Sequence, residues 1–92
     1  MNKRNELMNA IENEFDITFM RTSEEFNGTT DGIWISAEHG DTTKDGLLLI
    51  DYHTRNADLY IFGVHKDLNA LLNQHDYFAE FNDAGTLMAW PI

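Results

Sequence analysis

Residues 46–65 have the sequence GLLLIDYHTRNADLYIFGVH, in which two runs rich in Leu, Ile, Val, Tyr and Phe flank a polar centre. Such runs are typical of β-strands. We expect strands over 47–53 and 58–64, joined by a tight turn at 54–57. Pairing His53 with Asp58 assigns one face of this hairpin to the core. That face carries Leu48, Ile50, Tyr52, Leu59, Ile61 and Gly63, and the opposite face carries Leu47, Leu49, Phe62 and Val64 near its open end.

The remaining elements follow from periodicity. Leu7, Met8, Ile11 and Phe15 recur at helical spacing and predict a helix over 5–14. Leu68, Leu71 and Leu72 predict a second helix, which Asp67 or a neighbour would cap. Strands are expected at 16–21, 32–38, 77–81 and 86–90, with Phe81 opposite Thr86 and with polar loops at 22–30 and 39–46.

These elements predict one α+β domain covering residues 1–92. Its order is α-β-β-β-β-α-β-β, with two helices beside a mainly antiparallel sheet of about five to six strands. An apolar fraction of 42% favours a folded chain over a disordered one. The sequence contains no run long and apolar enough for a membrane span, and it contains no cysteine. With no cysteine and no signal-peptide pattern in the first fifteen residues, we expect a cytoplasmic protein.

Three patterns suggest chemistry, and for each the structural interpretation is favoured. Residues 41–46, DTTKDG, resemble the start of a calcium loop, but Thr43 and Tyr52 stand where two ligands belong. The four histidines lack metal-binding spacing. Asp51, His53, Asp58 and Tyr60 would form a polar patch on the hairpin, with an acid/base cluster as the functional alternative to a solvated strand end. We expect no catalytic residue, no cofactor and no metal site.

Charge is the unusual feature of the composition. Sixteen acids against six bases give a net charge of −10. Such a charge repels nucleic acid and anionic membranes and attracts basic surfaces. The loops at 22–43 and the segment 67–92 carry carboxylates without Lys or Arg. The candidate partner-binding residues are Glu24, Glu25, Asp31, Trp34, Glu38, Asp41 and Asp45, with Trp34 or Trp90 as an apolar anchor.

In size, charge and lack of cysteine the chain resembles the small acidic proteins that phages use against host defence, the anti-CRISPR and anti-restriction inhibitors, several of which mimic DNA. This resemblance spans the whole chain and contains no family motif. It implies a non-enzymatic inhibitor of a nucleic-acid-handling enzyme, located in a bacterial host cell, with a basic nuclease or CRISPR effector as partner. The alternatives are an immunity protein that neutralises a nuclease toxin and a homodimeric assembly module that pairs through Leu47, Leu49, Phe62 and Val64. A small enzyme built on Asp51, His53 and Tyr60 is a further alternative.

Overall fold

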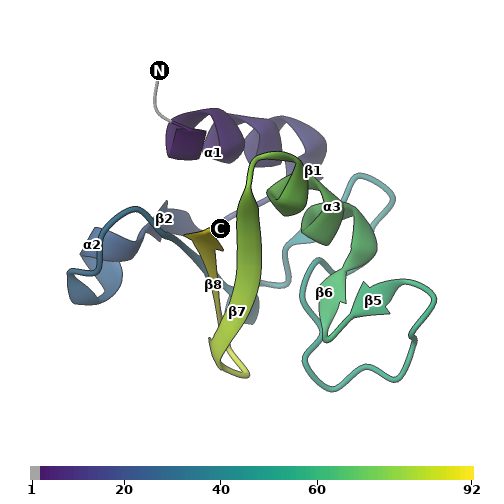
Figure 1. Ribbon diagram of the computed structural model, residues 1–92. Helices are drawn as coiled ribbons and strands as arrows, with labels where there is room; N and C mark the ends of the chain where they lie inside the picture. Colours follow the sequence, from purple (N-terminus) through teal and green to yellow (C-terminus); the bar gives the residue numbers. More distant parts are fainter. Residues whose placement is uncertain (1–2) are drawn as a thin grey trace.

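The computed structural model describes residues 3–92 and has an α+β fold (Figure 1). In chain order the elements are α1 (Lys3–Glu14), β1 (Phe15–Asp16), β2 (Met20–Thr22), α2 (Ser23–Asn27), β3 (Ile33–Ser36), the 3-10 helix η1 (Ala37–His39), β4 (Thr42–Thr43), β5 (Tyr60–Ile61), β6 (Val64–His65), α3 (Lys66–Gln74), β7 (Tyr77–Asp83) and β8 (Thr86–Pro91). The predicted fold class is confirmed. The described chain has three helices instead of two and eight short strands instead of five or six. None of its helices is long and apolar enough to cross a membrane.

The main sheet has four antiparallel strands in the order β2-β3-β8-β7. Two further ladders contain two strands each, β1 with β4 and β5 with β6. In Figure 1, β7 lies at the front edge of the sheet, α2 lies beside β2, and β5 and β6 lie on the far side of β7 from α2. The ladder of β5 and β6 thus lies beside the main sheet, and Val64 of β6 joins the same core as that sheet.

Helices α1 and α3 cover one face of the main sheet. Their buried leucines and isoleucine pack against β3 and β8 in one continuous core. The fully buried members are Leu7, Ile11, Ile33, Ile35, Leu49, Leu68, Leu72, Leu87 and Ala89. The sequence analysis predicted both helices from the spacing of their apolar residues, which include Leu7, Ile11, Leu68 and Leu72. This part of the core was therefore predicted correctly.

The predicted hairpin of 47–53 with 58–64 is wrong. The chain turns a second time at Phe62 and Gly63, which both have positive φ (+49° and +84°), so β5 pairs with β6. Residues 49–51 instead lie beside 63–65, with Ile50 bridged to Val64 and with the Leu49 carbonyl accepting from the His65 N–H at 2.8 Å.

This second turn overturns the predicted faces of the hairpin. Leu49 and Val64, assigned to the outer face, are buried, whereas Tyr52 and Ile61, assigned to the core, are 50% and 44% exposed. Val64 reaches the core because the Phe62–Gly63 turn reverses the chain one residue before it.

The register of β7 and β8 also differs from the predicted one. Phe81 pairs with Leu87, and an irregularity between Phe81 and Asp83 places Asp83 opposite Thr86. Because one extra residue shifts the alternation of the strand, Leu87 and Ala89 face the helices while Met88 and Trp90 face away from them. The two helices therefore leave the other face of the sheet to aromatic side chains.

Candidate protein-binding face

The face of the main sheet opposite α1 and α3, here called the outer face, is centred on tryptophan. Trp34 of β3 lies directly opposite Met88 of β8, and Trp90 lies opposite Phe78 of β7. Paired residues of antiparallel strands project to the same side, so these four side chains share one surface. Met88 is buried at its centre, Trp34 and Trp90 are half-buried, and Phe78 is 40% exposed.

Trp34 is held by aromatic neighbours from two other segments. Phe19, which precedes β2, meets it edge to face with ring centroids 4.8 Å apart. Phe26 of α2 lies on its other side at 5.0 Å, and His39 of η1 stacks on Phe19 at 5.5 Å. The Arg21 guanidinium lies 5.0 Å from the Phe19 ring, a cation–π contact. These contacts extend the aromatic surface to both ends of β3.

Trp90 is fixed by a close approach and by a hydrogen bond. Its indole ring covers Gly32 so tightly that a Cβ added there would lie 2.4 Å from the ring. Its Nε1–H donates to Glu80 Oε1 at 3.2 Å. The ring orientation is therefore determined by the bare backbone beneath it and by the carboxylate beside it.

Four carboxylates belong to the elements that form or flank the outer face and are here called the rim carboxylates: Glu25 of α2, Glu38 of η1, and Glu80 and Asp83 of β7. Glu25 precedes Phe26 on α2, and Glu80 lies on the face itself. Glu38 and Asp83 meet at the β7–β8 turn, where both approach the same side of Gly85. Within residues 3–92, Lys and Arg form ion pairs with three other carboxylates, those of Asp16, Glu24 and Asp76.

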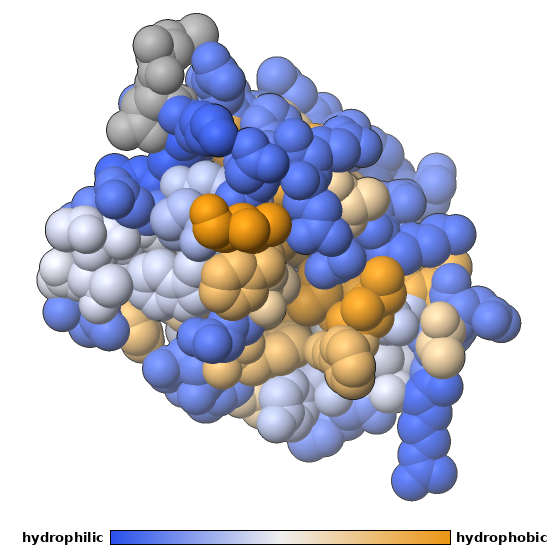
Figure 2. All heavy atoms as spheres, in the orientation of Figure 1, coloured by the Kyte–Doolittle hydropathy of each residue, from blue (hydrophilic) through white to orange (hydrophobic). Residues whose placement is uncertain are grey.

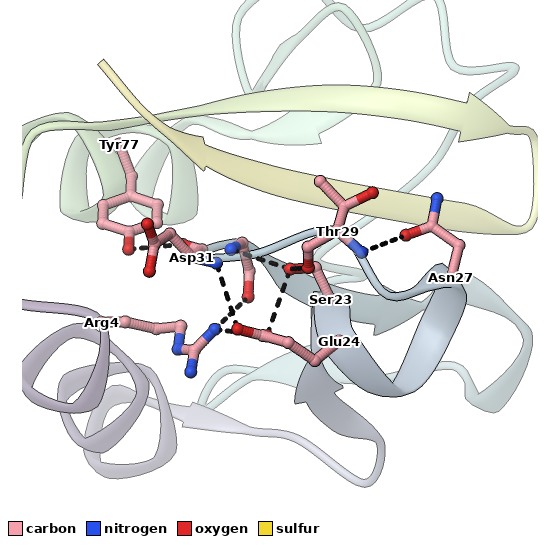
Figure 3. A network of polar contacts seen from close by, with 8 residues as sticks. Arg4, Ser23, Glu24, Asn27, Thr29, Asp31 and Tyr77 are labelled. Atoms are coloured by element: carbon pink, nitrogen blue, oxygen red, sulfur yellow. Dashed lines mark hydrogen bonds and ion pairs between the residues drawn. The ribbon is translucent and has the colours of Figure 1, made fainter.

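A buried polar network holds α2, and with it Phe26, against the sheet (Figure 3). Ser23 is fully buried, and its hydroxyl accepts from the Gly32 N–H at 2.9 Å and donates to the Thr29 carbonyl. Arg4 Nη1 reaches from α1 to Glu24 Oε1 at 2.6 Å, and the Tyr77 hydroxyl donates to the Asp31 carbonyl at 2.7 Å. The network joins α1, α2, the loop before β3, and β7.

The environment of Glu24 favours its charged form. Hydrogen bonding from its own backbone N–H, from Arg4 and from the Asp31 N–H lowers the pKa of this carboxyl below its usual value. Glu24 was predicted to meet a partner, and the structure gives it and Asp31 roles within the fold.

The other predicted site residues separate into two groups. Trp34 lies on the outer face, and Glu25 and Glu38 belong to α2 and η1, which contribute aromatic rings beside it. Asp45 lines a hollow of about 410 Å³ together with Glu14, the last residue of α1. Glu24 instead pairs with Arg4, in the first turn of the same helix. Asp41 is 7% exposed and accepts from the Phe19 N–H at 3.4 Å, so its carboxylate faces inward. The seven predicted residues therefore do not converge on one surface.

Sequence reasoning missed Phe19, Phe26, Phe78 and Glu80 as members of the face. Glu80 lies two residues from Phe78 on β7, and this period-2 spacing was a usable signal. Phe19 and Phe26 lie outside the main strands, and only the tertiary fold brings them to Trp34.

The predicted polar patch of Asp51, His53, Asp58 and Tyr60 is arranged differently from the prediction. Tyr60 lies opposite His65 instead of Asp51, and its hydroxyl donates to the Leu48 carbonyl at 2.8 Å. Burial, and secondarily the charge of Asp51, raise the pKa of Tyr60 above its usual value. The His53 ring packs edge-on against Tyr52. Among residues 3–92, no three His, Asp or Glu side chains gather in a group that could hold a metal ion.

Comparison of the chain with protein-family models, with curated proteins and with solved structures finds no match.

Proposed function

We propose that this protein is a non-enzymatic inhibitor that binds the basic nucleic-acid cleft of an enzyme acting on DNA or RNA. One observation carries the proposal. The outer face presents two tryptophans, and its four rim carboxylates form no ion pair with Lys or Arg among the described residues.

An aromatic centre within a charged border is the usual composition of a protein-binding surface. Trp34 and Trp90 are fixed before binding by their neighbours, so little conformational entropy is lost when a partner covers them.

The charge of the chain selects the kind of partner. A net charge of −10 steers the protein towards positively charged surfaces and away from nucleic acid itself. The largest basic surfaces of nucleic-acid enzymes are the clefts that bind phosphates, and Arg pairs with carboxylate and phosphate alike. Carboxylates such as Glu25 and Glu38 would then occupy phosphate positions.

The proposal is tested by capture in competition with nucleic acid. The protein is immobilised, loaded with the heparin-retained proteins of a bacterial lysate, and eluted with double-stranded DNA or with RNA. We expect specific elution of a nucleic-acid enzyme whose activity the free protein inhibits. Capture that neither DNA nor RNA displaces, or that leaves the enzyme fully active, would contradict the proposal.

A matched pair of variants sharpens the capture experiment. Glu25→Gln/Glu38→Gln removes two rim carboxylates, and Glu6→Gln/Glu12→Gln removes two exposed carboxylates from α1, on the opposite side of the sheet. Both variants have a net charge of −8, since each loses two of the sixteen acids. Capture should fall only for the rim variant.

A further inference from the structure

The lobe formed by residues 47–62 has an apolar surface distinct from the outer face. Seven large hydrophobic side chains are exposed in the described chain, and five of them belong to this short segment: Leu47, Leu48, Tyr52, Ile61 and Phe62. Figure 2 shows hydrophobic spheres gathered over β7 and continuing towards the side where β5 and β6 lie. Such clustering marks an interaction surface more strongly than scattered single residues do.

Phe62 protrudes from this surface in an unfavourable conformation. It is 94% exposed, and its φ of +49° lies in the left-handed region, where a bulky side chain is rare. A two-residue turn with positive φ at both positions favours Asn-Gly. Because the ring gains almost no burial in return, the fold itself does not explain a phenylalanine here. Strain of this kind is typical of functional positions.

A hollow of about 460 Å³ lies beside Phe62 on the same lobe. Its walls include Tyr52, Tyr60 and Ile61, and Arg55 is the charged side chain among its lining residues. The hollow is large enough for a phenyl ring, and Phe62, which is 94% exposed, is itself among its lining residues. One surface therefore carries both an apolar projection and an apolar recess, as a self-complementary two-fold interface requires.

Charge on this lobe also suits a second copy of the chain. Residues 47–62 contain Asp51, Asp58 and Arg55, so with neutral histidine they carry a net charge of −1 out of the total of −10. Two copies that approach through this segment bring together only a small part of the negative charge of the chain. In a two-fold arrangement, Arg55 of each copy can meet Asp58 of the other.

We propose that the protein forms a two-fold homodimer through residues 47–62, with Phe62 of each copy seated in the hollow of the other. This interface uses neither tryptophan, and it does not depend on the proposed inhibitory function. It leaves the outer face available to a different partner.

Sedimentation equilibrium over a wide concentration range tests the dimer. We expect the wild-type mass to rise from 10.6 kDa towards twice that value. Phe62→Asn should raise the dimer dissociation constant at least about tenfold, because it removes the central anchor. Ile92→Thr, which changes an exposed hydrophobic side chain outside the lobe, should dimerise as the wild type does. A monomeric wild type, or equal dimerisation of the wild type and Phe62→Asn, would overturn the proposal.

Charge reversal tests the two-fold arrangement and does not rely on Phe62. Arg55→Glu and Asp58→Arg should each weaken self-association when alone. Mixed together, the two variants should form a heterodimer as tightly as the wild type pairs with itself, since both cross-contacts regain opposite charges. A mixture that stays monomeric would contradict the two-fold pairing. Thermal unfolding of each variant establishes that it is folded.

Discussion

Ser23 is the residue on which the position of α2 depends most. It has no exposed surface, and its hydroxyl uses both its donor and its acceptor capacity within the loop that leads to β3. Removing the hydroxyl would leave the Gly32 N–H and the Thr29 carbonyl without this partner in a buried place. Buried polar groups that lose their partner are among the costliest local defects.

We therefore predict that Ser23→Ala lowers the free energy of unfolding by about 2 kcal/mol. Urea denaturation monitored by circular dichroism measures this change. Ser36→Ala is the matched control. It removes a half-buried hydroxyl that accepts from the Glu38 N–H, and it should cost roughly half as much. Equal losses in the free energy of unfolding for the two variants would show that the Ser23 hydroxyl stabilises the fold no more than an ordinary helix cap does.

Glu24 makes the stability that this network provides depend on pH. Its hydrogen bonds lower its pKa in the folded state, so its contribution to stability is present above the unfolded value near 4.5 and is lost as pH falls through the folded value. We predict that wild type is more stable than Glu24→Gln at pH 7 and that the difference shrinks as the pH is lowered below 4.5. Urea denaturation over a series of pH values measures the difference. A difference that does not change with pH would contradict the ion pair with Arg4.

At the scale of elements, the outer face depends on the fit of β8 against the start of β3. Trp90 lies directly over Gly32, and Ser23 borders the same position from α2. A side chain at position 32 would displace the indole ring and disturb one of the two tryptophans of the proposed binding face.

We predict that Gly32→Ala destabilises the fold by about 1–3 kcal/mol, as overpacking does, and shifts the tryptophan emission. Gly28→Ala is the control. Position 28 has open space around it, so an added Cβ contacts no aromatic ring. Its φ of +82° nevertheless strains the backbone of any residue with a side chain. Both variants should unfold at lower urea concentration. An unchanged emission spectrum in Gly32→Ala would show that Trp90 does not pack on position 32.

At the turn between β5 and β6 we predict a substitution that stabilises the fold. Asn accepts positive φ much better than Phe, and the Phe62 ring is almost fully exposed. Phe62→Asn should therefore raise the free energy of unfolding by about 1 kcal/mol. Measured at protein concentrations where the wild type is monomeric, a clear loss of stability would mean that the ring packs within its own chain.

The sequence predicted those elements whose side chains repeat with a clean period. The helical spacing of Leu7 and Ile11, and of Leu68 and Leu72, located both large helices. These residues are buried by the elements they define, so local pattern and tertiary packing agree.

The errors arose where one residue changes the direction or the register of the chain. A turn with a phenylalanine at positive φ carries no recognisable signature, so 58–64 was assigned as one strand although it divides at Phe62 and Gly63. The irregularity after Phe81 places Phe81 opposite Leu87 instead of Thr86. Met88 and Trp90 therefore lie on the outer face. The placement of the candidate site residues depends on tertiary contacts. Trp34 lies on the outer face, whereas Asp41 is buried beside the Phe19 N–H, a contact that no local sequence pattern indicates.

At the scale of the whole molecule, one face of the sheet is covered by α1 and α3, and the other carries both tryptophans of the chain. The dimer proposed through residues 47–62 leaves the outer face uncovered, so a dimer would present two such faces. The excess of negative charge then favours a partner whose binding surface is positively charged.

Because Trp34 and Trp90 are the only tryptophans, their emission reports directly on the outer face. The decisive measurement is a titration of the protein with a short oligo-arginine peptide at physiological ionic strength, monitored by tryptophan fluorescence. It is run in parallel on wild type, on Glu25→Gln/Glu38→Gln, and on Glu6→Gln/Glu12→Gln. We predict a saturable change in emission for wild type and for the α1 variant, with clearly weaker binding for the rim variant. Equal weakening in both variants, or no change in emission with wild type, would contradict the assignment of the outer face as the surface that binds a basic partner.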